Sequence, residues 1–238
     1  MFAILKKEFN SFFASPIAYV VIGVFLLMNG LFLWIFKDDF NILNAGFADL
    51  NSFFFLVPRV FIFLIPAITM KSFADEYSNG TIELLKTKPI SEWQIVFGKF
   101  LASLLLIVVA IIPTFTYVYS VYQLGNPVGN LDIGSTIGSY IGLLFLAATY
   151  TSIGLFTSTL SKNQIVAFIL SVFLTFILFY GFDAIAYSLD NKLTIQKIGF
   201  NEHYKSISRG IIDTRDLIYF VSVTAFFLFI TKTRLENE

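Results

Sequence analysis

Cysteine is absent from this 238-residue chain, and histidine occurs once, at position 203. Without cysteine there can be no disulfide, no thiolate nucleophile and no Cys-ligated metal or iron–sulfur site. A single histidine excludes a histidine cluster, and the apolar stretches hold no paired carboxylates and no Ser/His/Asp grouping. We therefore expect neither an enzyme nor a protein that carries a metal or another cofactor.

Charge is also scarce. Charged residues make up 13% of the chain, whereas soluble domains carry about 25%. The formal net charge is zero, which gives no reason to expect a nucleic-acid partner. In contrast, 57% of the residues are hydrophobic and lie in long blocks. This composition predicts an all-α protein that crosses the lipid bilayer several times.

A helix needs about 20 apolar residues to cross the hydrocarbon core of a membrane. Six stretches approach this length, within what we expect to be a single transmembrane domain over residues 1–238. The first is too long for the apolar region of a signal peptide and no small-x-small cleavage site ends it, so we expect it to be retained. The six stretches are 17–36, 53–70, 100–122, 137–160, 164–182 and 217–231.

Residues 1–15 form a separate amphipathic pattern. Phe2, Leu5, Phe9 and Phe12 recur at helical spacing with polar residues between them. Such a helix lies along a membrane interface, and Pro16 separates it from the first span. The alternative is a simple extension of that span.

Basic residues indicate the orientation. If the N-terminus is cytoplasmic, Lys and Arg are more numerous in the inner segments, and the short outer loop 123–136 has none. Most of the remaining basic residues fall in the long outer loop 183–216, where the positive-inside rule loses force. We expect both termini in the cytoplasm and the chain in the inner membrane of a bacterial cell.

The charged segment 71–99 is the main candidate for function. Asn79 and Gly80 form a turn pair, and Thr81 can cap a short helix that ends near Thr87, because Pro89 disfavours helical backbone at the preceding residue. A helix of at most two turns is unstable alone and has to dock against something. The alternative is an ordinary polar loop.

The tetrapeptide Ser91 to Gln94 reads as a capping box that opens the third span. The whole stretch ADEYSNGTIELLKTKPISEWQIVFGKFLA resembles the signature of ABC-2-type transporter permeases, and the six spans and the amphipathic N-terminus also fit that family. The residues in the signature positions are Glu76, Gly80, Thr81, Glu83, Leu84, Leu85, Pro89, Ser91, Gly98, Lys99 and Phe100.

The resemblance implies a coupling helix over Thr81–Thr87 that sits in a cleft of a separate ATP-binding subunit. There Glu83 would pair with a basic residue, and Leu84 and Leu85 would fill an apolar floor. The chain has no phosphate-binding loop of its own, so the partner must hydrolyse ATP. The resemblance also implies a dimer with a second copy or a related permease. The residues expected at the ATPase contact are Glu76, Gly80, Thr81, Glu83, Leu84, Leu85 and Pro89.

The outer piece 204–220 resembles the branch of the family that contains gliding-motility and copper-centre maturation permeases, the gliding-motility type most closely. The function implied is ATP-driven export or membrane work. The alternatives are a structural subunit that powers or assembles surface machinery without moving a solute, and a copper-site maturation permease. A stand-alone secondary transporter ranks last, because the spans hold almost no ionisable residues.

Arg59 is the exception, about 9 Å inside the second span by helical rise. A charge at that depth costs a few kcal/mol unless it reaches the headgroups or finds a partner. It either reaches the outer headgroups or makes a substrate or gating contact, with Asp183 as one candidate partner. Separately, Gly134, Gly138 and Gly142 recur at every fourth position, a spacing that lets helices pack closely within the subunit or across a dimer.

Overall fold

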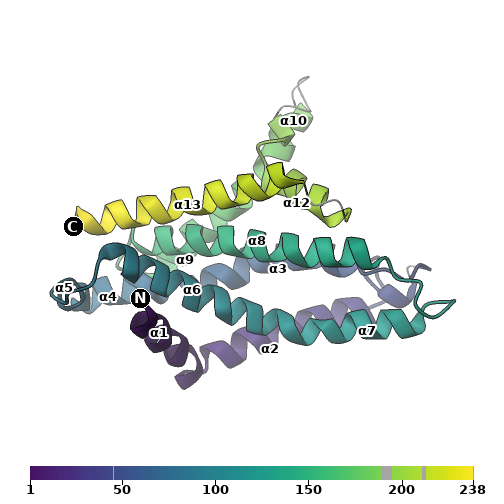
Figure 1. Ribbon diagram of the computed structural model, residues 1–238, viewed down its shortest axis with the longest axis horizontal. Helices are drawn as coiled ribbons and strands as arrows, with labels where there is room; N and C mark the ends of the chain where they lie inside the picture. The colour runs from purple at the N-terminus through teal and green to yellow at the C-terminus, as the bar shows by residue number, and fades with distance from the viewer. Residues whose placement is uncertain (45, 189–194, 211–212, 238) are drawn as a thin grey trace.

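Every regular element of the chain is a helix in the parts that the computed structural model describes, residues 1–44, 46–188, 195–210 and 213–237. The prediction of an all-α protein is confirmed, and Figure 1 shows long helices that run side by side. The α-helices are α1 (Phe2–Ala14), α2 (Ile17–Gly30), α3 (Asn51–Thr69), α4 (Lys71–Ser78), α5 (Thr81–Lys86), α6 (Glu92–Ile111), α7 (Phe115–Leu124), α8 (Ile133–Ser158), α9 (Gln164–Phe176), α10 (Phe182–Ser188), α12 (Phe200–Ser208) and α13 (Thr214–Glu236). The short π-helices are η1 (Leu31–Ile35) and η4 (Ile177–Gly181), and the short 3₁₀ helices are η2 (Ile42–Asn44) and η3 (Ile112–Thr114).

Six helical stretches of the described chain are long and apolar enough to cross a membrane, as predicted. Each coincides with one of the expected spans, although several continue beyond the apolar residues. The six stretches are Ile17–Ile35, Asn51–Ser78, Glu92–Leu124, Ile133–Ser158, Gln164–Tyr187 and Thr214–Glu236.

The ends of these helices differ most from the expected ranges. The last span was expected over 217–231, but α13 begins at Thr214, because the Asp213 side chain accepts a hydrogen bond from the backbone N–H of Arg215 at 2.9 Å. The second span was expected to stop at Met70, but the backbone N–H there bonds to the Pro66 carbonyl and the helical path continues directly into α4. The length of an apolar stretch therefore underestimates the length of a helix whose ends are polar.

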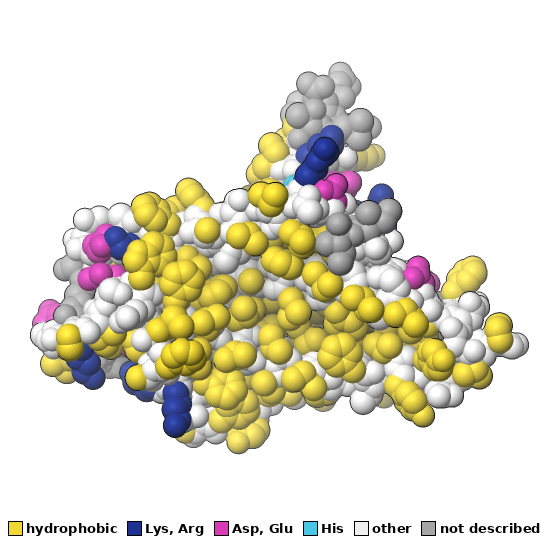
Figure 2. Space-filling view, in the orientation of Figure 1, with side chains coloured by type: hydrophobic (Ala, Val, Ile, Leu, Met, Phe, Trp, Pro, Cys, Tyr) yellow, Lys and Arg dark blue, Asp and Glu magenta, His cyan; other side chains and the backbone are white. Residues whose placement is uncertain are grey.

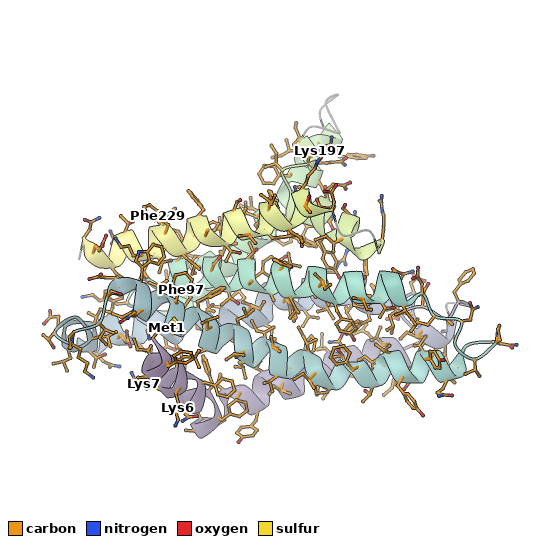
Figure 3. The ribbon with its side chains drawn as sticks, in the orientation of Figure 1. Met1, Lys6, Lys7, Phe97, Lys197 and Phe229 are labelled. Atoms are coloured by element: carbon orange, nitrogen blue, oxygen red, sulfur yellow. The ribbon has the colours of Figure 1, made fainter. Side chains whose placement is uncertain are left out.

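The N-terminal helix α1 is separate from the first span, with Ser15 and Pro16 between them. Ile4 is buried against α6, where Gly98 leaves room for it: a Cβ at position 98 would lie 2.8 Å from the Ile4 Cγ2. Lys6 and Lys7 project away from the bundle (Figure 3). The helix is thus amphipathic, as its pattern predicts.

Helix α8 lies at the centre of the bundle and packs against α3, α6, α9, α12 and α13. Much of its buried surface consists of small and hydroxyl side chains. The hydroxyls of Thr151, Ser152 and Ser158 donate to carbonyls three or four residues earlier in the same helix. The polar groups are thereby satisfied without water, so neighbouring helices can approach α8 closely.

Pro58 leaves a backbone carbonyl of α3 free to accept a hydrogen bond from α12. A proline has no N–H, so it cannot donate to the carbonyl four residues earlier, that of Phe54. The phenol of Tyr204 donates to this carbonyl instead, at 2.9 Å. Burial raises the pKa of the Tyr204 phenol well above its ordinary value, with a smaller opposing effect from the Arg59 charge, so the group remains a neutral donor.

The outer flank of the bundle is apolar. Figure 2 shows hydrophobic side chains over the flank, while charged side chains gather mainly at the end that carries α5 and near α12. We call these the α5 end and the α12 end. An apolar flank between charged ends suits a helix bundle that is surrounded by lipid.

The three glycines at four-residue spacing have different surroundings. A Cβ at Gly138 would lie 2.7 Å from the backbone oxygen of Ile207, and one at Gly142 would lie 3.3 Å from the Tyr204 ring. A Cβ at Gly134 would meet only the Asp132 carboxylate, at 3.4 Å. Two of the three glycines therefore make room for α12.

We expect Gly138→Ala to destabilise the protein by about 1–3 kcal/mol, the typical cost of overpacking, because the backbone oxygen of Ile207 cannot move aside freely. Gly134→Ala is the matched control and should be neutral or slightly stabilising, since alanine favours helix. Thermal unfolding of both variants in detergent checks this. Equal midpoints for the two variants would contradict the packing described above.

Candidate functional site

The segment between the second and third spans folds as a helical hairpin. Helix α4 continues the direction of α3, and Gly80 then takes a φ of +67° in the left-handed region, which favours glycine. Helix α5 follows over Thr81–Lys86, so the predicted turn at Asn79–Gly80 and the short helix after it are both confirmed. The glycine is what allows the chain to reverse within two residues.

The caps of this hairpin differ in part from the prediction. The residue that precedes α5 is Gly80, and the Thr81 hydroxyl does not cap the helix but donates to the Glu76 carbonyl at 3.4 Å. Carbonyls at the C-terminal end of α4 lack helical partners, so this hydroxyl satisfies one of them. Ser91 caps α6 as predicted, because its Oγ accepts from the Gln94 N–H at 3.4 Å.

Helix α5 has one buried and one exposed side. Ile82 is buried in an apolar cluster with Phe73 and Ile95, and Leu85 packs partly against it. Leu84 is 65% exposed, and Glu83 beside it is also exposed, as are Gly80, Thr81 and Pro89. The exposed side of α5 therefore presents Glu83 and Leu84 at the charged end of the bundle, while Ile82 attaches its other side to the apolar cluster.

Lys99 lies just behind the hairpin and is buried. Its Nζ donates to the Glu76 carboxylate at 2.9 Å, to the Glu8 carboxylate at 3.1 Å and to the Ser72 carbonyl at 2.7 Å. These partners come from α4 and α1, and the lysine itself from α6. We call this group the Lys99 cluster. All three ammonium hydrogens have acceptors, which offsets the cost of burying the charge.

The cluster changes the interpretation of two residues. Lys99 was identified as a signature position, and the structure shows that its side chain is buried, with 2% exposed. Glu76, expected at the ATPase contact, directs one carboxylate oxygen at Lys99. Glu8 was not singled out by the sequence, because a glutamate in an amphipathic helix gives no sign of a partner 91 residues away.

A groove of about 450 Å³ runs beside α5. Tyr77, Gly80 and Glu83 line one side of it. The other side comes from the connection between α8 and α9, including Lys162, and from Arg234 near the end of α13. Three of the six spans therefore end at the surface next to this short helix, where a bound protein could contact all of them.

Arg59 lies on α3 near the α12 end. Its guanidinium carbon sits 3.2 Å from the centroid of the Phe55 ring, and the same group donates to the Phe55 carbonyl. Asp183, the suggested partner, accepts from the Asn201 amide at 2.5 Å instead. Within the described chain Arg59 forms no ion pair, so this charge has only aromatic and backbone partners.

The fold and the site together define a multi-pass membrane protein with a short helical hairpin exposed at one end of its bundle. The sequence model of the family described as ABC-2 family transporter protein matches residues 2–234, and the chain belongs to this family. A comparison with curated proteins finds no match. Members of such a family are membrane subunits of transporters, not the ATP-hydrolysing subunits.

We expect Lys99→Met to destabilise the protein by about 3–5 kcal/mol, because it leaves the largely buried Glu76 carboxylate without a cation and leaves Glu8 with only the exposed Lys7, 3.6 Å away. The triple variant Lys99→Met/Glu8→Gln/Glu76→Gln should recover part of this loss, since the unpaired charges are then gone. Thermal unfolding in detergent gives both values. If the single and triple variants unfold at the same temperature, charge pairing does not hold this site together.

Proposed function

We propose that this chain is a permease subunit in which α5 is the coupling helix for a separate ATP-binding subunit. The observation that carries the proposal is the exposed Leu84 and Glu83 on a two-turn helix whose opposite side is anchored by Ile82. Helix α5 can transmit a displacement to the bundle only if α5 is rigidly attached to the bundle. The α5 end is then the cytoplasmic end, with both termini on the same side.

The Lys99 cluster provides this attachment in the proposed mechanism. Closure of an ATP-binding dimer moves α5, and α4 moves with it. Because Glu76 of α4 is bound to Lys99 and Lys99 is bound to Glu8, the third span and α1 follow the same displacement. Glu76 thus acts behind the contact surface, and Gly80, Thr81, Glu83, Leu84, Leu85 and Pro89 form or support the surface itself.

A pair of permease copies, or this chain with a related permease, completes the proposed complex, because an ATP-binding dimer offers two clefts. Within the family, the similarity of residues 204–220 to the gliding-motility branch supports a role in export or membrane work connected with surface motility. A subunit that powers surface machinery without moving a solute would use the same coupling helix.

We expect Leu84→Asp and Glu83→Lys to abolish recovery of the ATP-binding subunit when the tagged chain is purified from its native membrane in mild detergent. The reason is that one substitution places a charge on an apolar contact and the other reverses a charge that pairs with a basic cleft. The measurement is the amount of a phosphate-loop protein that copurifies, together with the ATPase rate of the preparation.

Leu43→Asp is the matched control. Leu43 is 61% exposed, close to Leu84 in exposure, but it lies in η2 at the opposite end of the bundle. This variant should retain the partner and its activity. Loss of the partner in all three variants, or in none, would contradict the assignment of α5.

A further inference from the structure

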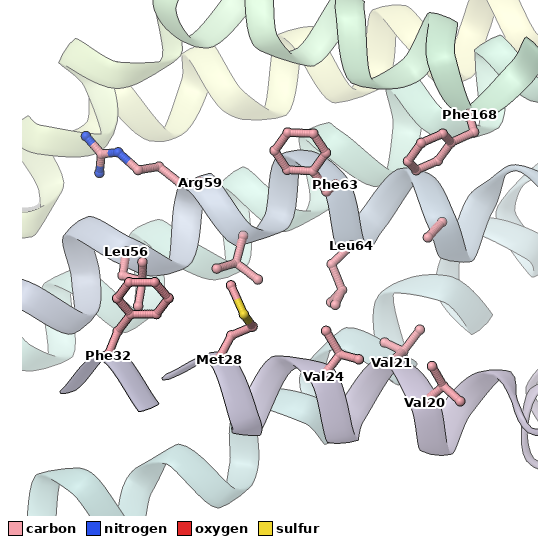
Figure 4. Close-up of a pocket in the computed structure, with 12 residues that line it drawn as sticks. Val20, Val21, Val24, Met28, Phe32, Leu56, Arg59, Phe63, Leu64 and Phe168 are labelled. Carbon is pink, nitrogen blue, oxygen red and sulfur yellow. The ribbon is translucent and has the colours of Figure 1, made fainter. Parts of the chain in front are cut away.

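Two cavities of different character meet at Arg59. The first is an apolar groove of about 590 Å³ between α2, α3 and α9, lined by Val20, Val24, Met28, Phe63 and Phe168 among others. Figure 4 shows these side chains on facing helices, with Arg59 toward one end of the group and Val20 toward the other. The second is a polar pocket of about 190 Å³ between α3 and α12. Arg59 is the residue that lines both.

The polar pocket carries positive charge. Its charged lining residues are Arg59 and Lys205. The rest of the lining combines polar residues such as Ser208 and Asn201 with aromatic and apolar ones such as Phe179. The nearby carboxylate of Asp183 is already bound to Asn201. Two cations that share a small pocket without an acidic lining residue favour an anion there.

Arg59 itself has unused donors. A guanidinium offers five N–H groups in a planar fork, and the described structure gives this one a single hydrogen bond, to the Phe55 carbonyl. It lies about 12 Å from the start of α3 by helical rise. An arginine at such a depth is stabilised by an anion, and the fork fits a phosphate or a carboxylate in a bidentate manner.

The apolar groove can hold the apolar part of such a ligand. From Arg59 it leads toward Val20, along about 12 residues of α2, which corresponds to about 18 Å at helical rise. Arg59 is its one charged lining residue. A groove of this length and composition fits an extended hydrocarbon chain, not a polar solute.

We propose that the two cavities form one binding site for an anionic amphiphile. Arg59 and Lys205 hold the phosphate or carboxylate headgroup, and the hydrocarbon tail lies in the apolar groove along α2 and α3. Phe55 stacks under the guanidinium and fixes its direction. This site lies away from α5, and its occupancy does not depend on the coupling mechanism proposed above.

The test is ligand binding to the purified chain in a neutral detergent, measured by native mass spectrometry. Phosphatidylglycerol and phosphatidylcholine with identical acyl chains compare headgroup charge at a constant tail. Lysophosphatidylglycerol, with one tail, and inorganic phosphate, with none, show which part of the ligand is needed. We expect phosphatidylglycerol and its lyso form to bind at least about tenfold more tightly than phosphatidylcholine, and inorganic phosphate not to displace them.

Variants separate the two halves of the site. Arg59→Gln should weaken phosphatidylglycerol binding about tenfold, whereas Arg59→Lys should weaken it less, because lysine keeps the positive charge but loses the bidentate fork. Val24→Trp fills the apolar groove and should weaken both lipid forms. Arg215→Gln, which removes an exposed cation from the first turn of α13 outside the site, is the matched control and should bind as the wild type does.

The proposal is overturned if phosphatidylcholine binds as well as phosphatidylglycerol, or if Arg59→Gln and Arg215→Gln weaken binding equally. Full displacement by inorganic phosphate would show a site for a free anion instead of an amphiphile. If Arg59→Gln fails to fold, the comparison of Val24→Trp with the wild type, together with the two headgroups, still decides the question.

Discussion

The buried ammonium of Lys99 is the constraint on which the α5 end of the molecule depends. It joins α1, α4 and α6, three helices that have no other charged contact in common among the described residues. A buried charge is stable only while its hydrogen-bond partners stay in place. Lys99 therefore stabilises the one packing of α1, α4 and α6 that brings all its partners together. Gly98, next to it, allows α1 to come close enough for Glu8 to reach.

A second constraint acts at the α12 end. Pro58 leaves the Phe54 carbonyl without a helical donor, and Tyr204 supplies one. Gly138 has no side chain, so the backbone oxygen of Ile207 can lie close to α8, where a Cβ would be only 2.7 Å from it. These contacts hold α12 against α3 and α8, beside Arg59, and thereby shape the polar pocket. The position of Arg59 and the packing of α12 are therefore parts of one arrangement.

Much of the fold could be predicted from the sequence, because the dominant signal is local. Apolar runs of about 20 residues predict spans wherever they occur, and all six appear as helices. The hairpin was predicted for a similar reason: the preference of Gly80 for left-handed backbone and the effect of Pro89 on the residue before it act within a few residues. The helix ends were predicted less well, because caps such as Asp213 extend a helix beyond its apolar stretch.

The sequence by itself determined the class of protein, the number of spans, the short helix after Gly80 and the similarity to transporter permeases, since each depends on composition or on neighbours along the chain. Only the tertiary structure decided which charges meet. Lys99 is 91 residues from Glu8, and Tyr204 is 150 residues from Phe54. Contacts across such separations depend on how helices pack, and that packing is set by the fit of many side chains at once, not by any local pattern.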